Sequence, residues 1–213
     1  MDANREWYKE SLLERVSENL KKRGFNAFWS RNRDEAKAKI LALIPEGSRV
    51  GIGGSISIRE LGIIDDLEAR GYTIVHHWKS ELSPELDFQI RREEIVTDVF
   101  LASTNALTID GIIVNTDGVG NRVAAMIFGP RKVILIAGVN KIVKSLDDAI
   151  WRIKNVAAPI NAHRLGSNTP CAKLGYCANC SGTASICRVT TIIEYKPSKT
   201  DFTVVLVNEE LGY

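Results

Sequence analysis

Residues 49–76 read RVGIGGSISIRELGIIDDLEARGYTIVH, and this stretch decides the fold. The runs 49–53 and 72–76 are short, rich in β-branched residues and bounded by glycine, which is typical of strands. Residues 57–70, between them, carry apolar side chains at helical spacing: Ile58, Leu61, Ile64 and Leu67. A strand, a helix and a second strand in succession form a βαβ unit, so the stretch predicts an α/β protein.

The rest of the chain continues this alternation. Helices are predicted before residue 24 and at 34–44, 84–96, 121–128 and 145–165, and strands at 25–29, 99–103, 106–109, 112–115, 132–137, 189–195 and 202–207. Asp110 and Gly111, between the strands at 106–109 and 112–115, predict a tight hairpin. The run 132–137, KVILIA, is the most apolar strand, which places it in the middle of the sheet. We therefore predict an α/β three-layer sandwich with a mostly parallel sheet. It comprises an N-terminal helical segment at 1–32 and a domain at 33–213 with a Cys-rich lobe at 166–188.

Composition favours one soluble globular domain. The chain has 213 residues, of which 45% are hydrophobic, and 28 Lys and Arg against 26 Asp and Glu give a net charge of +2. This balance excludes disorder, and it lacks the basic excess typical of nucleic-acid binding. No apolar run is long enough for a membrane span, and charged residues interrupt the first 20 positions, so we predict a cytoplasmic protein without a secretory signal.

Small polar residues follow the first strand of the βαβ unit. Ligands of open α/β sheets bind beyond the carboxyl ends of the strands, so this is where a site is expected. Gly53 and Gly54 allow close approach of the backbone to an anion, Ser55 and Ser57 offer hydroxyl groups, and the helix amino end adds N–H groups. The segment predicts a cradle for a phosphate or carboxylate. It matches neither the GxGxxG nor the GxxxxGK[ST] motif, and a plain tight turn is the alternative.

Further polar residues occur where other strands end, and we predict that they form the walls of the same anion site: Asn105, Asp117, Asn121, Arg122 and Lys141. Arg122 opens a helix, where a cation is unfavourable, so it is expected to face an anion. The alternatives are turn-forming roles for Asn and Asp, and a solvated surface position for Lys141.

Glu60 is the one candidate carboxylate near the cradle, and we include it among the predicted site residues. Stabilisation of the helix dipole is the alternative explanation for this position. His76 and His77 are interpreted as residues at the rim of the sheet. Because no pair of nucleophile and base is evident, the sequence assigns no catalytic mechanism.

All four cysteines fall between residues 171 and 187, in a loop rich in Gly, Asn and Pro: Cys171, Cys177, Cys180 and Cys187. Four thiolates form a complete ligand set for zinc or for an iron–sulfur cluster. Five Lys and Arg against one Glu in residues 161–199 are suited to the negative charge of such a site. Disulfides are disfavoured in the cytoplasm, and free structural or redox cysteines remain an alternative. Spacing alone does not separate zinc from a cluster.

Three segments resemble the LUD domain family of lactate-utilisation proteins: GGSISIREL, NALTIDGIIVNTDGVGNRVAAMIFGP and VNKIVKSLDDAIWRI. The resemblance extends over residues 34–213. It implies a fold similar to the sugar-phosphate isomerase and CoA-transferase superfamily, and a role in the oxidation of lactate to pyruvate beside iron–sulfur partner subunits. It also favours a [4Fe–4S] cluster over zinc at the four cysteines.

Two other functions remain open at this point. One is an enzyme acting on sugar phosphates or CoA esters, with zinc as a structural element, because one architecture hosts many reactions. The other is a non-catalytic subunit that docks a partner. In each case the expected small ligand is anionic, and a homo-oligomer is possible. The sequence leaves the substrate unspecified.

Overall fold

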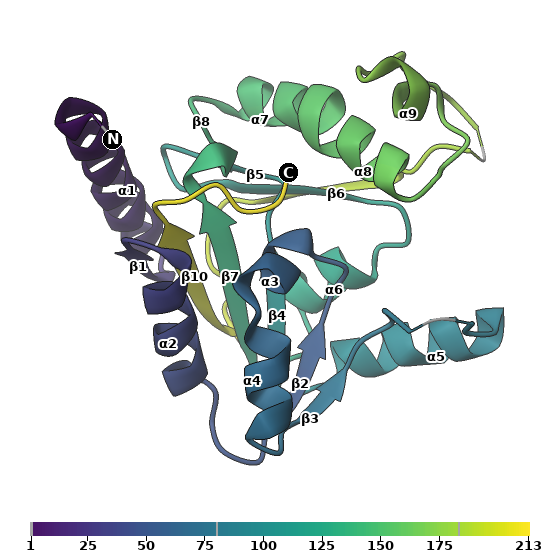
Figure 1. Ribbon diagram of the computed structural model, residues 1–213, viewed down its shortest axis with the longest axis horizontal. Helices are drawn as coiled ribbons and strands as arrows, with labels where there is room; N and C mark the ends of the chain where they lie inside the picture. The colour runs from purple at the N-terminus through teal and green to yellow at the C-terminus, as the bar shows by residue number, and fades with distance from the viewer. Residues whose placement is uncertain (1, 80, 183) are drawn as a thin grey trace.

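The computed structural model describes residues 2–79, 81–182 and 184–213. Its main sheet has six parallel strands in the order β1-β10-β7-β4-β2-β3 (Figure 1). Their bounds are β1 (Asn26–Ser30), β2 (Arg49–Ile52), β3 (Thr73–Val75), β4 (Val99–Ser103), β7 (Lys132–Gly138) and β10 (Asp201–Val207). Strand β7 pairs with β10 on one side and β4 on the other, which confirms its predicted place inside the sheet.

A second sheet has four strands in the order β8-β5-β6-β9. Their bounds are β5 (Ala106–Thr108), β6 (Ile113–Asp117), β8 (Ile142–Val143) and β9 (Val189–Ile193). Strands β5 and β6 form the predicted hairpin. The separate sheet itself was not predicted. This sheet depends on the pairing of β6 with β9, which are far apart in the sequence. The sequence of each strand does not indicate which strand it pairs with.

Helices cover both faces of the main sheet (Figure 1). Their bounds are α1 (Ala3–Lys22), α2 (Arg33–Leu43), α3 (Ile56–Leu61), α4 (Ile63–Ala69), α5 (Pro84–Ile95), α6 (Asn121–Ile127), α7 (Leu146–Arg152), α8 (Ala158–Arg164) and α9 (Pro170–Leu174). One core joins the sheet to α2, α3 and α4. The core on the opposite face includes α1, α6 and residues of the second sheet, and α7 packs on the second sheet in a smaller core.

Two predicted helices are interrupted. The helix expected at 57–70 is divided by Gly62, whose φ of +64° places it in the left-handed region that favours glycine. The helix expected at 145–165 contains a π-helical turn (Ile153–Ala157) between α7 and α8. Pro159 follows this turn, and because proline has no N–H to donate, the regular hydrogen-bond ladder is not available there.

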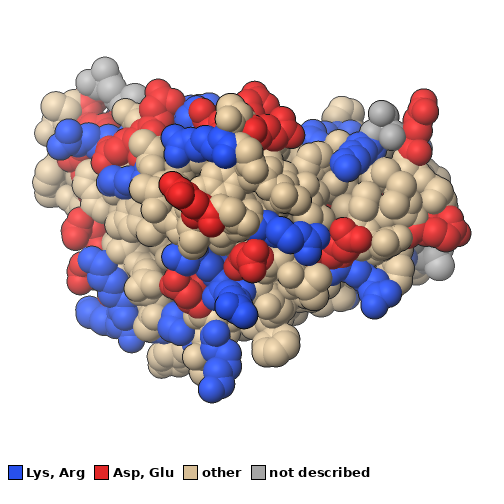
Figure 2. Space-filling view, turned by 90° about the horizontal axis from the view of Figure 1, so that it is seen from below, with Lys and Arg blue, Asp and Glu red and all other residues tan. Residues whose placement is uncertain are grey.

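The surface carries charges of both signs. Figure 2 shows Lys and Arg interspersed with Asp and Glu over the lower face of the molecule, without a continuous basic area. Among the described residues, no helix is both long and apolar enough to cross a membrane.

Candidate functional site

A cavity of about 490 Å³ lies at the carboxyl ends of β2, β4 and β7, where the strand-end rule places a ligand. Its wall also includes residues of α8, the segment before β9 and the C-terminal tail. Eight of the ten predicted site residues line it: Gly54, Ser55, Ser57, Asn105, Asp117, Asn121, Arg122 and Lys141. Segments that are distant in the sequence therefore meet around one cavity.

The other two predicted residues, Gly53 and Glu60, lie outside the cavity wall. A Cβ atom at Gly53 would be 3.0 Å from Cζ of Phe100 and 3.3 Å from Cγ of Arg122, so a side chain there would be in tight contact with both residues. Glu60 Oε2 accepts a hydrogen bond from the backbone N–H of Gly212 at 2.7 Å. Its carboxylate thus holds the C-terminal tail against α3.

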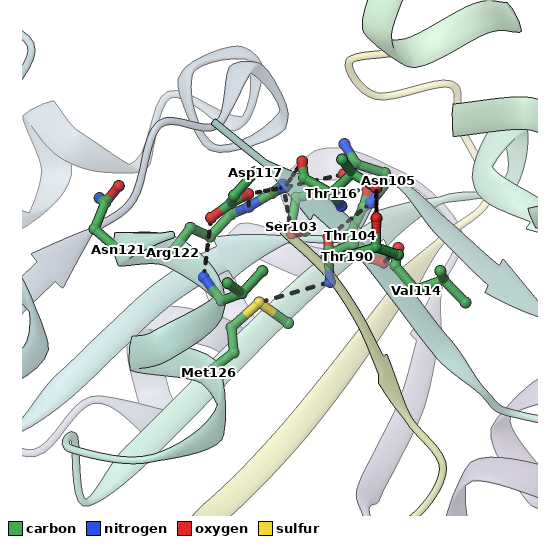
Figure 3. A network of polar contacts seen from close by, with 12 residues as sticks. Ser103, Thr104, Asn105, Val114, Thr116, Asp117, Asn121, Arg122, Met126 and Thr190 are labelled. Atoms are coloured by element: carbon green, nitrogen blue, oxygen red, sulfur yellow. Dashed lines mark hydrogen bonds and ion pairs between the residues drawn. The ribbon is translucent and has the colours of Figure 1, made fainter. Parts of the chain in front are cut away.

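The anion that Arg122 faces is a residue of this chain (Figure 3). Arg122 Nε donates to Asp117 Oδ1 at 2.8 Å, and Asp117 Oδ2 accepts the backbone N–H of Val123 at the start of α6. The guanidinium also donates to Asn105 Oδ1 at 2.9 Å and to the carbonyl oxygen of Thr116 at 3.0 Å. Arg122 therefore joins the ends of β4 and β6, and most of its hydrogen-bonding capacity is used within the protein.

Lys141 differs from Arg122 because its charge has no acidic partner. Its side chain is buried, and Nζ donates to the hydroxyl groups of Ser57 at 2.7 Å and Ser103 at 2.8 Å. In the described part of the chain, no carboxylate lies within ion-pair distance of this nitrogen. Burial lowers the pKa of Lys141 to about 7, and the nearby charges of Arg152 and Arg122 act in the same direction. The alternative of a solvated surface position for Lys141 is therefore wrong, because the side chain is buried at the wall of the cavity.

Arg152 adds a second buried cation behind Lys141. Its guanidinium donates to the backbone carbonyl oxygens of Asn140 at 3.0 Å and Asn105. Burial lowers the pKa of Arg152. The charges of Arg152 and Arg122 thus both act on the amino group of Lys141.

His77, which lines the cavity, forms a pair with Glu94 that sequence reasoning missed. Glu94 is fully buried on α5, and its Oε1 lies 2.5 Å from His77 Nδ1. Its Oε2 accepts a hydrogen bond from Asn121 Nδ2 at 2.9 Å. A signal was present, since Glu94 follows the buried Ile90 by four residues and so falls on the buried face of its helix.

The four cysteines line one smaller cavity of about 270 Å³. Burial and the other three thiols raise the pKa of Cys187. However, within residues 2–79, 81–182 and 184–213, no three or more His, Cys, Asp or Glu side chains are arranged to hold a metal ion. The predicted ligand geometry is therefore absent, although the donors face a common space. Thr183, within the predicted lobe, lies outside the described residues.

The cysteine cavity adjoins the strand-end cavity. Ala158, Ile186 and Cys187 line both. Cys187 lies just before β9, which pairs with β6 of the second sheet. The sequence alone did not place the cysteine loop beside the predicted anion site.

Comparison with known proteins agrees with this architecture. A model of the LUD domain matches residues 13–207. The crystal structure of a DUF162 family protein from Deinococcus radiodurans resembles this chain with a TM-score of 0.55 at 14% sequence identity, covering 93% of this chain and 97% of that chain. This likeness shows a shared fold. The search of curated proteins found no match. Because the domain model spans most of the sequence, the chain belongs to the LUD domain family.

Proposed function

We propose that this protein acts in lactate utilisation and that its strand-end cavity binds a small carboxylate such as lactate or pyruvate. The observation that carries the proposal is the buried amino group of Lys141, which faces the cavity without an acidic partner. Burial of an unpaired charge is unfavourable, and a bound carboxylate would supply the missing partner. Ser57 and Ser103 orient the amino group for this role.

The test is calorimetric titration of the protein with pyruvate and with L-lactate, in two buffers of different ionisation enthalpy. A bound anion raises the pKa of Lys141, so binding near neutral pH is expected to take up protons. Lys141→Met is expected to weaken binding about tenfold or more, since a charged hydrogen bond is lost. Lys144→Met is the matched control, because Lys144 is exposed and outside the cavity. If neither acid binds, the proposal is wrong.

A sugar phosphate or a CoA ester is the second candidate ligand. The volume of the cavity exceeds what a three-carbon acid requires and lies in the usual range for small-molecule sites. Thermal stabilisation by phosphosugars or acyl-CoA, without stabilisation by lactate or pyruvate, would favour this candidate.

We also propose that Cys171, Cys177, Cys180 and Cys187 hold a metal centre, with a [4Fe–4S] cluster favoured and zinc as the alternative. Four thiols around one cavity are a suitable donor set for either. Because the sulfurs do not form a ligand set in this structure, loading requires the loop to rearrange. Iron, sulfide and zinc analysis of anaerobically purified protein decides the question. Protein with neither metal would exclude this centre.

A cytoplasmic location and iron–sulfur partner subunits complete the proposal. None of the four cysteines is in a disulfide, as expected in a reducing compartment. Purification of the tagged protein from its native host tests the partners. If the protein purified alone has no activity but co-purifies with iron–sulfur subunits from its host, it is a non-catalytic subunit. Light scattering on the protein purified alone tests for a homo-oligomer.

A further inference from the structure

The outer edge of the His77 ring faces the strand-end cavity. A Cβ atom at Gly54 would lie 3.3 Å from His77 Nε2 and 3.6 Å from Nε1 of Trp78, so the absence of a side chain at Gly54 leaves Nε2 open. Both His77 and Gly54 line the cavity. In the described part of the chain, no protein group forms a hydrogen bond with Nε2.

The inner edge of the same ring is held by a buried carboxylate. Glu94 Oε1 accepts a hydrogen bond from the backbone N–H of His77 at 3.2 Å and lies 2.5 Å from Nδ1. A carboxylate only accepts hydrogen bonds, so Nδ1 carries a proton in both charge states of the ring. The proton that the ring gains or loses is therefore the one on Nε2, the atom that faces the cavity.

Asn121 fixes the carboxylate in turn. Its Nδ2 donates to Glu94 Oε2, and its Oδ1 accepts from Arg91, which is paired with Asp87 at 2.7 Å. Glu94 thus has hydrogen-bond partners on both oxygens and little freedom to rotate. A histidine oriented by a buried acceptor, with its second nitrogen exposed to a ligand cavity, is the arrangement of a general acid–base group.

We propose that His77 Nε2 exchanges a proton with the hydroxyl or carbonyl oxygen of the anion bound in this cavity, and that Glu94 and Asn121 are positioning residues. With a 2-hydroxy acid, the O–H bond breaks, its electron pair stays on oxygen, and an N–H bond forms at Nε2. With a 2-oxo acid, the protonated ring donates a hydrogen bond to the carbonyl oxygen. The transfer involves no change of oxidation state. This inference rests on the proposed carboxylate site.

Two ligands that differ in a single oxygen test the inference. Pyruvate and propionate share a carboxylate and a three-carbon chain, but only pyruvate has the C2 oxygen. We expect calorimetry to show that the wild-type protein binds pyruvate about tenfold more tightly than propionate, the ratio typical of one good hydrogen bond. His77→Phe should remove this preference and retain propionate binding, because phenylalanine replaces the ring without an N–H group to donate. Glu94→Gln should reduce the preference, because the ring loses its fixed orientation.

The neighbouring histidine supplies the matched control. His76 lies outside the cavity wall, and its Nδ1 accepts the backbone N–H of Trp78. His76→Phe is therefore expected to keep the wild-type ratio of the two affinities. Equal affinity of the wild type for both acids, or a preference that survives in His77→Phe, would overturn the inference and leave the carboxylate site intact. Failure of the wild type to bind either acid would instead refute the proposed function.

A measurement on the wild-type protein does not depend on how the variants fold. The chain has three histidines, so the ring nitrogens of His77 can be assigned by ¹⁵N NMR. The neutral ring is expected to carry its proton on Nδ1 and none on Nε2. A neutral ring with its proton on Nε2 contradicts the proposed role.

Discussion

The amino group of Lys141 donates a hydrogen bond to the hydroxyl of Ser103, although 38 residues separate them in the sequence. The contact exists because β4 and β7 are neighbouring parallel strands, so their carboxyl ends meet at one edge of the sheet. Ser57, in the first turn of α3 after β2, completes the environment of the amino group. Parallel topology is therefore the direct cause of the buried, unpaired cation on which the proposed site depends.

The pH dependence of stability is expected to report on Lys141. Its pKa is about 7 in the folded protein and about 10.5 when unfolded, so between these values the unfolded chain binds more protons. Lys141 therefore makes the free energy of unfolding rise with pH in this window, by up to about 1.4 kcal/mol per pH unit.

Urea denaturation of the wild type and of Lys141→Met, at several pH values from about 7 to 10, measures this contribution. The difference between the two proteins should change steadily with pH, whereas Lys144→Met should follow the wild type. A constant difference between the wild type and Lys141→Met would show that the amino group titrates normally.

Asp117→Asn is expected to destabilise the protein by about 3 kcal/mol, because the guanidinium of Arg122 would remain buried beside a neutral amide. Chemical denaturation measures the loss. Glu18→Gln removes the exposed ion pair with Lys21 and is expected to have little effect. Similar small losses in both variants would mean that the Arg122 network does not stabilise the fold.

Gly54→Ala is expected to weaken pyruvate binding and leave the thermal unfolding temperature nearly unchanged. The added methyl group would lie 3.3 Å from His77 Nε2, at the cavity wall, and Gly54 has no positive φ to be strained by a side chain. Gly62→Ala provides the contrast, since its φ of +64° predicts a loss of about 1 kcal/mol in stability without a direct effect on the ligand. Unchanged affinity in Gly54→Ala would place the ligand elsewhere.

Glu60→Ala is expected to loosen the C-terminal tail. It removes the acceptor of the Gly212 backbone N–H, whereas the Leu211 N–H is still held by Asn140 Oδ1. Hydrogen exchange followed by NMR should show faster exchange at Gly212 than at Leu211. Glu60→Gln keeps an acceptor oxygen at the same position and is expected to behave as the wild type. Equal protection of Gly212 in all three proteins would contradict this role.

Much of the fold was readable in the sequence because the signals are local. The alternation in residues 49–76 predicts two parallel strands and their connection, and Asp110-Gly111 predicts the hairpin between β5 and β6. The sequence also shows that polar residues follow the predicted strands, which indicates where the site lies. The resemblance to the LUD domain family agrees with the domain model, which spans most of the chain. Each signal lies within one short stretch, where periodicity and turn chemistry act directly on the backbone.

Tertiary structure alone decided which side chains meet. It paired Arg122 with Asp117, placed Glu94 beneath His77, formed a separate sheet from β9 and β6, and brought the cysteine loop to the wall of the strand-end cavity. It also left the four thiols without the geometry of a metal site. These contacts join residues that are distant along the chain. Such contacts form only when the sheets and helices pack together, so they cannot be predicted from any single stretch of the sequence.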